Sequence, residues 1–348
     1  MEHKNLNVEV FTLGGGDTVG GSCYVISFNK ARIMIDAGAI LSKENKIIYP
    51  DFGFLEEKYK DIFKELDYLL ITHGHLDHCG AILEVYKKNP KIKILMTEET
   101  REILRANLIS GNLSFEEEMD LDTCLSMVTV IDFRQALKLK CNDNTFINIE
   151  FFRAGHILGA SSIYINNKDV GVFVTGDYCL NDQETIKGMD IPKDYKIDLL
   201  ITETTYGNKI DSSLTSRNYE KQKLIHIVKE ALKNGKKVLI PAFSIGRSQE
   251  IISILKDELN ACDNERLYID GMVMRINKIY EKFLDINYKG NMYTFKNGIY
   301  DTKHEFINQE VLNNKSCVVV SSGMLQKGSA VIEYAINFFE KEKIVYVS

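Results

Sequence analysis

Four potential metal ligands lie within six residues of this chain. His73, His75, Asp77 and His78 follow directly after the apolar run 68–71. That run is typical of a β-strand, so His73 and His75, two residues apart, would leave the strand end pointing the same way. Imidazole nitrogens mixed with carboxylate oxygen suit zinc best, with manganese and iron as alternatives, and the lack of a thiolate argues against a closed structural site. The motif therefore predicts a catalytic metal centre.

Three more polar residues, Asp36, His156 and Asp177, come at or just after the ends of apolar, strand-like runs. Taken singly, each has a simpler explanation, because a lone histidine is usually structural and an aspartate often caps a strand or a turn. Their ordered recurrence instead indicates that several strand ends deliver ligands to one edge. A single catalytic zinc needs only three protein ligands and a water, so this surplus predicts two metal ions.

The order of these residues resembles the metallo-β-lactamase superfamily, whose αββα sandwich binds two zinc ions at the edge of its two sheets. Three later segments resemble signatures of the β-CASP domain of its nucleic-acid-processing members: ITETTYG (201–207), PAFSIGRSQE (241–250) and SSGMLQKG (321–328). The chain is thereby identified as a member of the β-CASP ribonucleases of the messenger-RNA 3′-end-processing endonuclease and ribonuclease J type. The resemblance implies a metallo-β-lactamase domain over 1–207 and a parallel α/β β-CASP domain over 208–348.

The resemblance also implies roles for the ligands. The first zinc ion would be held by His73, His75 and His156, and the second by Asp77 and His78, with Asp177 bridging the pair. A water between two such cations would be a hydroxide near neutral pH and would attack phosphorus in line. The predicted function is therefore hydrolysis of RNA phosphodiester bonds.

Two further carboxylates are expected at this catalytic centre together with Asp77. Asp36 would orient the ligating histidines from behind them, as such partners do in metal sites, with a strand-end cap as its alternative role. Glu203, in the first β-CASP signature, would protonate the leaving oxygen together with a late histidine of the family, or would be purely structural here.

Three residues of the β-CASP signatures are predicted to bind substrate. Arg247 and Lys327 would contact phosphates, or would instead pair with nearby carboxylates. Tyr206 would stack on a base, or would pack between the two domains. RNA is the expected partner.

The chain departs from the family pattern at its end. The resemblance implies a return to the first domain with two more histidines, one of which completes the second metal site, yet after His156 the chain has only His226 and His304. We therefore expect an incomplete sandwich, a fragment of a longer protein, whose exposed face is covered by a partner chain or a second copy. The alternatives to an active ribonuclease are a catalytically impaired RNA-binding or pairing subunit and a small-molecule metallo-hydrolase of the same superfamily.

Composition sets the outer bounds. The chain has 348 residues, of which 45% are hydrophobic and 26% charged, as expected of an ordinary globular protein of two domains. Its seven cysteines include no C-x-x-C pair, which together with the polar N-terminus and the lack of a long apolar run predicts a cytoplasmic protein outside the membrane. Cys79 is expected to turn into a helix and not to bind metal. The net charge of −6 confines RNA binding to a local basic groove.

Apolar periodicity and turn residues predict the elements. Strands are expected at 8–13, 23–28, 32–36, 68–71, 92–96 and 147–152, with helices at 98–109 and 115–128. From residue 216 the pattern alternates between helix and short apolar strand, with strands at 236–241, 267–270 and 317–320, helices beginning near 246, 272 and 329, and a last strand-like run at 343–348. That alternation predicts a parallel α/β domain.

Overall fold

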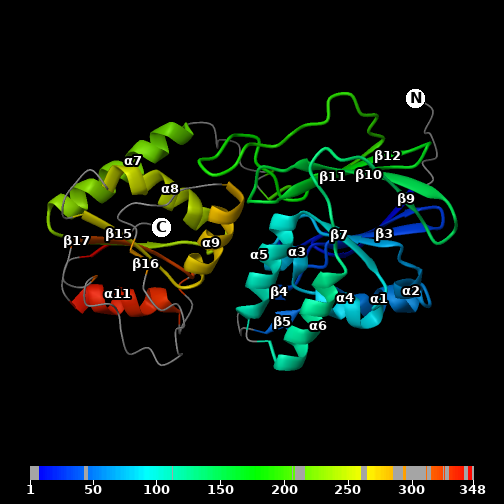
Figure 1. The fold of residues 1–348 in the computed structure, drawn as a ribbon, viewed down its shortest axis with the longest axis horizontal. Coiled ribbons are helices and arrows are strands. Elements are labelled where there is room, and N and C mark those ends of the chain that lie inside the picture. Colours follow the sequence, from blue (N-terminus) through cyan, green and yellow to red (C-terminus); the bar gives the residue numbers. More distant parts are fainter. Residues whose placement is uncertain are drawn as a thin grey trace. The chain divides into compact units, whose positions relative to one another are not determined.

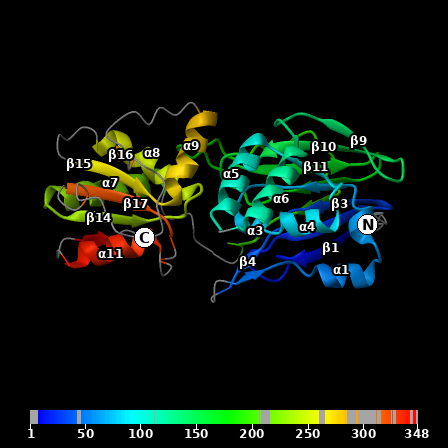
Figure 2. The ribbon, with the colours of Figure 1, turned by 60° about the horizontal axis from the view of Figure 1, so that its bottom comes forward.

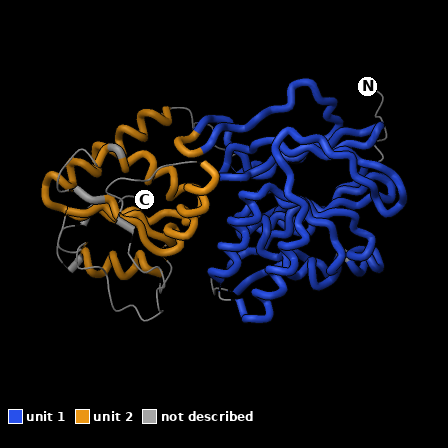
Figure 3. Tube along the Cα trace, viewed as in Figure 1, with its two compact units in different colours: residues 1–182, 186–205 blue, residues 183–185, 206–348 orange. Residues whose placement is uncertain are grey.

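The computed structural model describes residues 8–42, 46–111, 113–205, 207, 216–259, 265–284, 293–294, 311, 315–323, 325, 329–340 and 344–346. The chain forms two compact units (Figure 3). Unit 1 comprises residues 1–182 and 186–205, and unit 2 comprises residues 183–185 and 206–348.

Unit 1 begins with a sheet that runs from antiparallel to parallel. Its strand order is β1-β2-β3-β6-β7-β8, with β1 (Val8–Gly14), β2 (Cys23–Phe28), β3 (Ala31–Ile35), β6 (Tyr68–Leu70), β7 (Lys93–Met96) and β8 (Thr129–Val130). The first three strands form a meander, and β3, β6, β7 and β8 then lie parallel. The carboxyl ends of β3 and β6 therefore lie at the same edge of the sheet.

Helices cover one face of this sheet (Figure 1): α1 (Phe52–Lys58), α2 (Ile62–Glu65), α3 (Leu76–Cys79), α4 (Ile82–Lys88), α5 (Glu98–Ile109) and α6 (Phe115–Ser126). A small hairpin of β4 (Ile40–Leu41) and β5 (Ile47–Ile48) precedes them. Local sequence explains where the longer helices begin. Thr97 caps α5, and Ser114 forms a capping box with Glu117 at the start of α6.

A second sheet packs on the other face of the first. Its order is β13-β12-β11-β10-β9, with β9 (Leu137–Lys140), β10 (Phe146–Arg153), β11 (Ser161–Asn166), β12 (Gly171–Val174) and β13 (Leu199–Ile201). Alternate residues of its strands, such as Ile149, Ile163 and Val172, bury their side chains between the two sheets. The two sheets and their helical cover have the architecture expected from the sequence.

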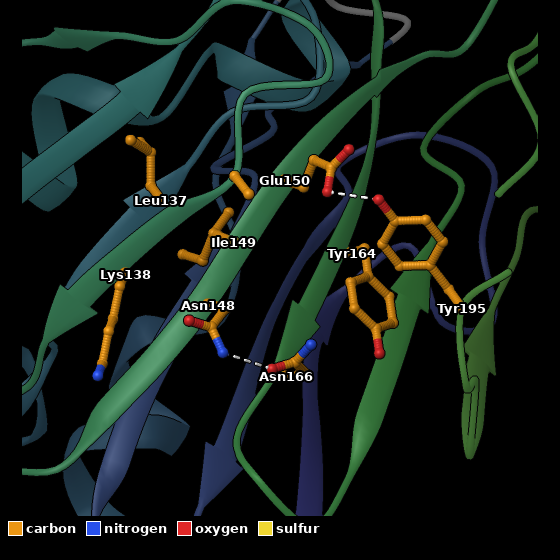
Figure 4. A pocket seen from close by; sticks show the side chains of 9 residues that line it. Leu137, Lys138, Asn148, Ile149, Glu150, Tyr164, Asn166 and Tyr195 are labelled. Atoms are coloured by element: carbon orange, nitrogen blue, oxygen red, sulfur yellow. Dashed lines mark hydrogen bonds between the residues drawn. The ribbon is translucent and has the colours of Figure 1, made fainter.

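Irregular chain covers part of the outer face of the second sheet. Phe152, Tyr164 and Phe173 pack there against Met189 and Tyr195. A cavity of about 320 Å³ opens beside them (Figure 4), lined by Ala136, Leu137, Lys138, Asn148, Ile149, Glu150, Tyr164, Asn166 and Tyr195. None of the predicted metal ligands lines it.

Unit 2 is the predicted parallel α/β fold. Its strand order is β16-β15-β17-β14-β18, with β14 (Lys237–Pro241), β15 (Glu265–Asp270), β16 (Tyr293–Thr294), β17 (Lys315–Val320) and β18 (Ile344–Tyr346), all parallel (Figure 2). Helices α7 (Arg217–Lys233), α8 (Arg247–Leu259) and α9 (Met272–Leu284) share a core with one face, and α11 (Ala330–Glu340) packs on the other.

Most expected element bounds agree with the structure to within two residues. One difference has a clear cause: β3 stops at Ile35 and excludes Asp36, because Asp36 has φ +56° and leaves the extended conformation. Among the helices of the described residues, none is both long and apolar enough to cross a lipid bilayer.

Candidate metal centre

The predicted ligands meet at one edge of unit 1, where strands from both sheets end. Asp36 follows β3, His73 and His75 follow β6, and Asp177 follows β12. His156 lies in the loop between β10 and β11, and its neighbours Gly155 and Gly159 both have positive φ. The hydroxyls at the start of α5 fix this loop, because Thr97 and Thr100 both donate to the carbonyl of Gly159.

Three imidazole nitrogens and a carboxylate oxygen converge at this edge. His73 Nε2 lies 3.1 Å from His75 Nδ1, which lies 3.2 Å from His156 Nε2. Asp177 Oδ2 is 3.9 Å from His73 Nε2 and 3.7 Å from His156 Nε2. All four ligand atoms lie within 4.8 Å of one another. Tetrahedral ligands about 2.1 Å from a zinc ion would be separated by roughly 3.4 Å, so this donor set fits one small divalent cation.

A second group of donors adjoins the first. The other carboxylate oxygen of Asp177, Oδ1, lies 3.4 Å from His78 Nε2, and Asp77 Oδ2 lies 4.0 Å from the same nitrogen. The short helix α3 provides both Asp77 and His78. Asp177 therefore directs one oxygen toward each group of donors.

Buried hydrogen bonds behind the histidines fix which nitrogen faces the centre. His78 Nδ1 donates to Asp36 Oδ2 at 2.6 Å, which leaves His78 Nε2 directed at Asp177. Asp36 also accepts from the backbone N–H and the hydroxyl of Thr72, at 2.7 and 2.8 Å. Since the Thr72 hydroxyl donates to Asp36, its oxygen is available to His73 Nδ1, 3.1 Å away. Both rings are held as metal-binding histidines usually are.

The electrostatics of the edge follow from burial and from these contacts. Burial, with the charges of the neighbouring imidazoles, lowers the pKa of His73 well below its usual range, so its ring is neutral. Burial also opposes a charged His78, but Asp36 and Asp177 outweigh it and raise the pKa of His78. Burial raises the pKa of Asp177, yet His78 and the other histidines bring it down to about 2. Asp177 is therefore ionised at neutral pH.

Close backbone packing fixes the position of α3. Ser22 N–H donates to the Asp77 carbonyl at 2.7 Å, and Ala37 N–H donates to the His78 carbonyl at 2.9 Å. A Cβ added to Gly38 would overlap the Asp77 carbonyl oxygen, so only glycine fits at that position. The segment after β3 therefore fixes the backbone of the second donor group.

The other predicted residues lie in different places. Glu203 is partly exposed. Its carboxylate accepts a hydrogen bond of 3.4 Å from the backbone N–H of Tyr178, the residue that follows Asp177, so it lies near the donors. Arg247 is exposed at the start of α8 in unit 2. Three residues lie outside the described part of the chain: Tyr206 and Lys327, which were predicted to bind substrate, and His304. Cys79 is fully buried, burial raises the pKa of its thiol well above the usual range, and it lies outside the group of donors that converge at the edge.

Thr72 was not among the residues predicted to form the site. Its hydroxyl lies between Asp36 and His73, and it also lies 3.5 Å from His78 Nδ1. The available signal was its place at the end of the apolar run, immediately before the first histidine, where a hydroxyl would be buried and would need partners.

Known proteins are similar to this chain over most of its length. Residues 12–215 match the family model described as "Anti-Pycsar protein Apyc1". An RNase J-like protein of Methanocaldococcus jannaschii is 29% identical, over 92% of this chain and 72% of that protein. The "Probable RNase MJ4" of the same organism is 30% identical, over 97% and 77%. The Integrator complex subunit 11 homolog of Dictyostelium discoideum is 30% identical, over 86% of this chain but 41% of that protein.

A solved structure has the same fold. The crystal structure of a protein of unknown function from Enterococcus faecalis matches with a TM-score of 0.60 and 15% identity, over 97% of this chain and 86% of that chain. The chain belongs to the family that the Apyc1 model describes and, over most of its length, to the β-CASP ribonucleases of the metallo-β-lactamase superfamily.

Proposed function

We propose that this protein is a metal-dependent hydrolase that cleaves RNA phosphodiester bonds and that its metal centre holds two zinc ions. The proposal assigns His73, His75 and His156 to the first ion, and Asp77 and His78 to the second. Asp177 would bridge the two ions. When bound, the ions would supply Lewis-acid charge to an attacking water and to the phosphate oxygens. The names of the relatives, which include an RNase J-like protein and a probable RNase, support RNA as the substrate.

The orientation of the Asp177 carboxylate carries this proposal. Its Oδ2 faces the nitrogens of His73 and His156, and its Oδ1 faces His78. A single cation would use only the donors around Oδ2. The separate nitrogen and oxygen donors around Oδ1, from His78 and Asp77, are accounted for by a second cation. The arrangement is the one expected of a centre that clamps both the attacking and the leaving oxygen of a phosphodiester.

The remaining residues have proposed roles around the ions. Asp36 would hold the proton on His78 Nδ1 and thereby keep Nε2 free to bind. Glu203 accepts a hydrogen bond from the N–H of Tyr178, next to Asp177 in the chain. It would donate a proton to the leaving oxygen. Arg247 would pair with a phosphate. Units 1 and 2 would correspond to the metallo-β-lactamase and β-CASP domains.

The test measures metal content and RNA cleavage on the same protein. Elemental analysis should find about two zinc ions per chain, and a labelled single-stranded RNA should be cleaved. His75→Ala removes a nitrogen from the middle of the first donor group, so cleavage should fall at least 100-fold, the scale expected when a catalytic metal is misplaced.

His226→Ala is the matched control, because that imidazole lies on α7 with 76% of its side chain exposed and should leave both readouts unchanged. Cleavage of RNA by His75→Ala at the parent rate would contradict the proposed function. So would a full complement of zinc in a parent protein that hydrolyses small phosphodiesters and leaves RNA intact.

A further inference from the structure

Helix α5 contacts both chain segments that contain the nitrogen donors of the first proposed ion. His73 and His75 lie in irregular chain after β6, and His156 lies in a glycine-flanked loop after β10. Irregular segments are more mobile than the elements they connect, whereas the ligands of a metal must be held to within about 0.5 Å. Support must therefore come from outside the two segments. Helix α5 lies beside α3 in the helical cover of the first sheet (Figures 1 and 2).

The first contact lies at the start of α5. The Gly159 carbonyl, three residues after His156, accepts from the hydroxyls of Thr97 and Thr100, at 2.9 and 3.0 Å. Both threonines are fully buried. A Cβ on Gly159 would lie 2.8 Å from the Thr100 nitrogen, so the loop packs directly against the backbone of the helix. The loop that contains His156 is thus fixed to the start of α5.

The second contact lies near the other end of the same helix. Asn107 Nδ2 donates to the Gly74 carbonyl at 3.0 Å, and Gly74 stands between His73 and His75 in the chain. A Cβ on Gly74 would lie 2.6 Å from Cγ2 of Ile103, so α5 also packs against this backbone. The segment that contains the other two histidines is thus fixed to the end of α5.

Both contacts come from one face of a well-anchored helix. Thr100, Leu104 and Asn107 follow one another at intervals of four and three residues, which places them on the same side of α5. Thr100 and Asn107 are two turns apart, roughly 10 Å along the axis. Leu104 and Leu108 are buried in the core between the helices and the first sheet. A helix anchored in this way keeps the distance between its two contacts constant.

We propose that α5 sets the position of His156 relative to His73 and His75, and that Asn107 is a positioning residue for the first zinc ion. Asn107 acts through the Gly74 carbonyl and not as a ligand. This inference rests on the proposed function and adds how the spacing of the ligands is maintained.

The test measures zinc affinity by competition with a chelator, in an Asp77→Ala background. That change removes a donor of the second ion, so the measured affinity reports on the first. Asn107→Leu keeps a side chain of similar size that suits a helix but lacks the Nδ2–H donor. It should weaken zinc binding about tenfold, the lower end of the range for loss of a supporting hydrogen bond.

Thr100→Val removes a hydrogen bond at the other end of the helix. It should weaken zinc binding to a similar extent, while the Thr97 hydroxyl still donates to the Gly159 carbonyl. Either change alone lets the two segments move relative to each other, so the second change should add little. The double variant should therefore lose much less affinity than the product of the two single losses. Losses that multiply would mean that the two bonds act separately, and α5 would not set the spacing.

Asn89→Leu is the matched control. Asn89 Nδ2 donates to the Phe63 carbonyl at 2.7 Å, a bond that joins the end of α4 to α2 and involves neither segment that contains the histidines. Urea unfolding of the zinc-free proteins measures the stability that each asparagine variant loses. Equal zinc affinity of Asn107→Leu and Asn89→Leu would overturn the positioning role of Asn107, whatever their stabilities. Absence of bound zinc from the parent protein would instead contradict the proposed function itself.

Discussion

Asp36 contacts the candidate metal centre through His78. It is completely buried, and its three hydrogen bonds go to His78 Nδ1 and to two groups of Thr72. Burial raises the pKa of Asp36, and the contacts with His78 and Thr72 oppose that rise. The proposed role of this carboxylate is to orient the His78 imidazole, whose other nitrogen faces Asp177.

Asp36→Asn tests this role. Asparagine tolerates the left-handed conformation at φ +56°, so the backbone should be preserved, while the negative charge is lost and only a weaker amide oxygen remains as acceptor for His78 Nδ1–H. Zinc affinity, measured by competition with a chelator, should fall about 10- to 100-fold. Asp61→Asn is the matched control, since Asp61 has φ +61° and an exposed side chain paired with Lys64. Unchanged zinc affinity in Asp36→Asn would assign Asp36 a purely structural role.

The residues of the centre were predictable to different degrees. Four of them form one local motif, whose residue types and spacing are enough to predict metal binding: His73, His75, Asp77 and His78. Thr72 belongs to no such motif, because its contact with the site depends on Asp36, which lies 36 residues away in the chain. The hydrogen bonds that fix tautomers depend on tertiary packing, which one-dimensional spacing does not encode.

At the scale of elements, local signals account for the helix bounds. The helix expected at 98–109 matches α5 at both ends, and the helix expected to begin near residue 272 begins as α9 at Met272. The helix expected to reach residue 128 ends as α6 at Ser126, where Met127 and Val128 donate to Cys124 and Leu125 in a tighter turn. No comparable local signal indicates which strands pair, since β17 lies between β15 and β14 through contacts between residues that are distant in the chain.

Gly38→Ala tests how the segment after β3 positions α3. The added methyl group would overlap the Asp77 carbonyl oxygen, so α3 would have to move together with Asp77 and His78. We expect the bound zinc to fall from about two ions to one per chain, because the donors of the second ion shift while those that follow β6 and β10 remain. Elemental analysis after dialysis measures this.

Gly53→Ala is the control for the glycine test. Gly53 lies in α1, and the nearest atom to an added Cβ is 3.5 Å away, an ordinary contact. This variant should keep both ions and gain up to about 1 kcal/mol of stability from helix propensity. Two ions retained in Gly38→Ala would show that α3 tolerates the displacement, and the proposed link between β3 and the second donor group would be wrong.

For the whole molecule, the sequence pattern predicted the layers better than the surfaces. Alternating helix and apolar strand after residue 216 specified the parallel sheet of unit 2, because such strands are buried on both faces. The cavity on the second sheet of unit 1 had no such signal. Its lining residues, such as Glu150 and Tyr195, meet across 45 positions of the chain through a hydrogen bond of 2.7 Å.

The buried thiols predict how the stability of the molecule depends on pH. Burial raises the pKa of Cys23, Cys79 and Cys317, and raises the pKa of Cys124 and Cys141 to about 12. An unfolded thiol ionises near pH 8.5, so above that pH the unfolded chain has lost protons that the folded protein retains. Stability that is complete below about pH 8.5 is therefore lost as the pH rises toward the folded values, by up to about 1.4 kcal/mol per pH unit for each thiol.

Urea unfolding between pH 7.5 and 10.5, with reductant present, measures this dependence. The free energy of unfolding should be constant up to about pH 8 and should then fall steeply. Cys124→Ala is the informative variant: it should be less stable at pH 7.5, because it leaves a gap in the core between α6 and the first sheet, but its stability should fall less steeply with pH. Identical slopes in the two proteins would mean that Cys124 ionises equally in the folded and unfolded chains, contrary to its burial.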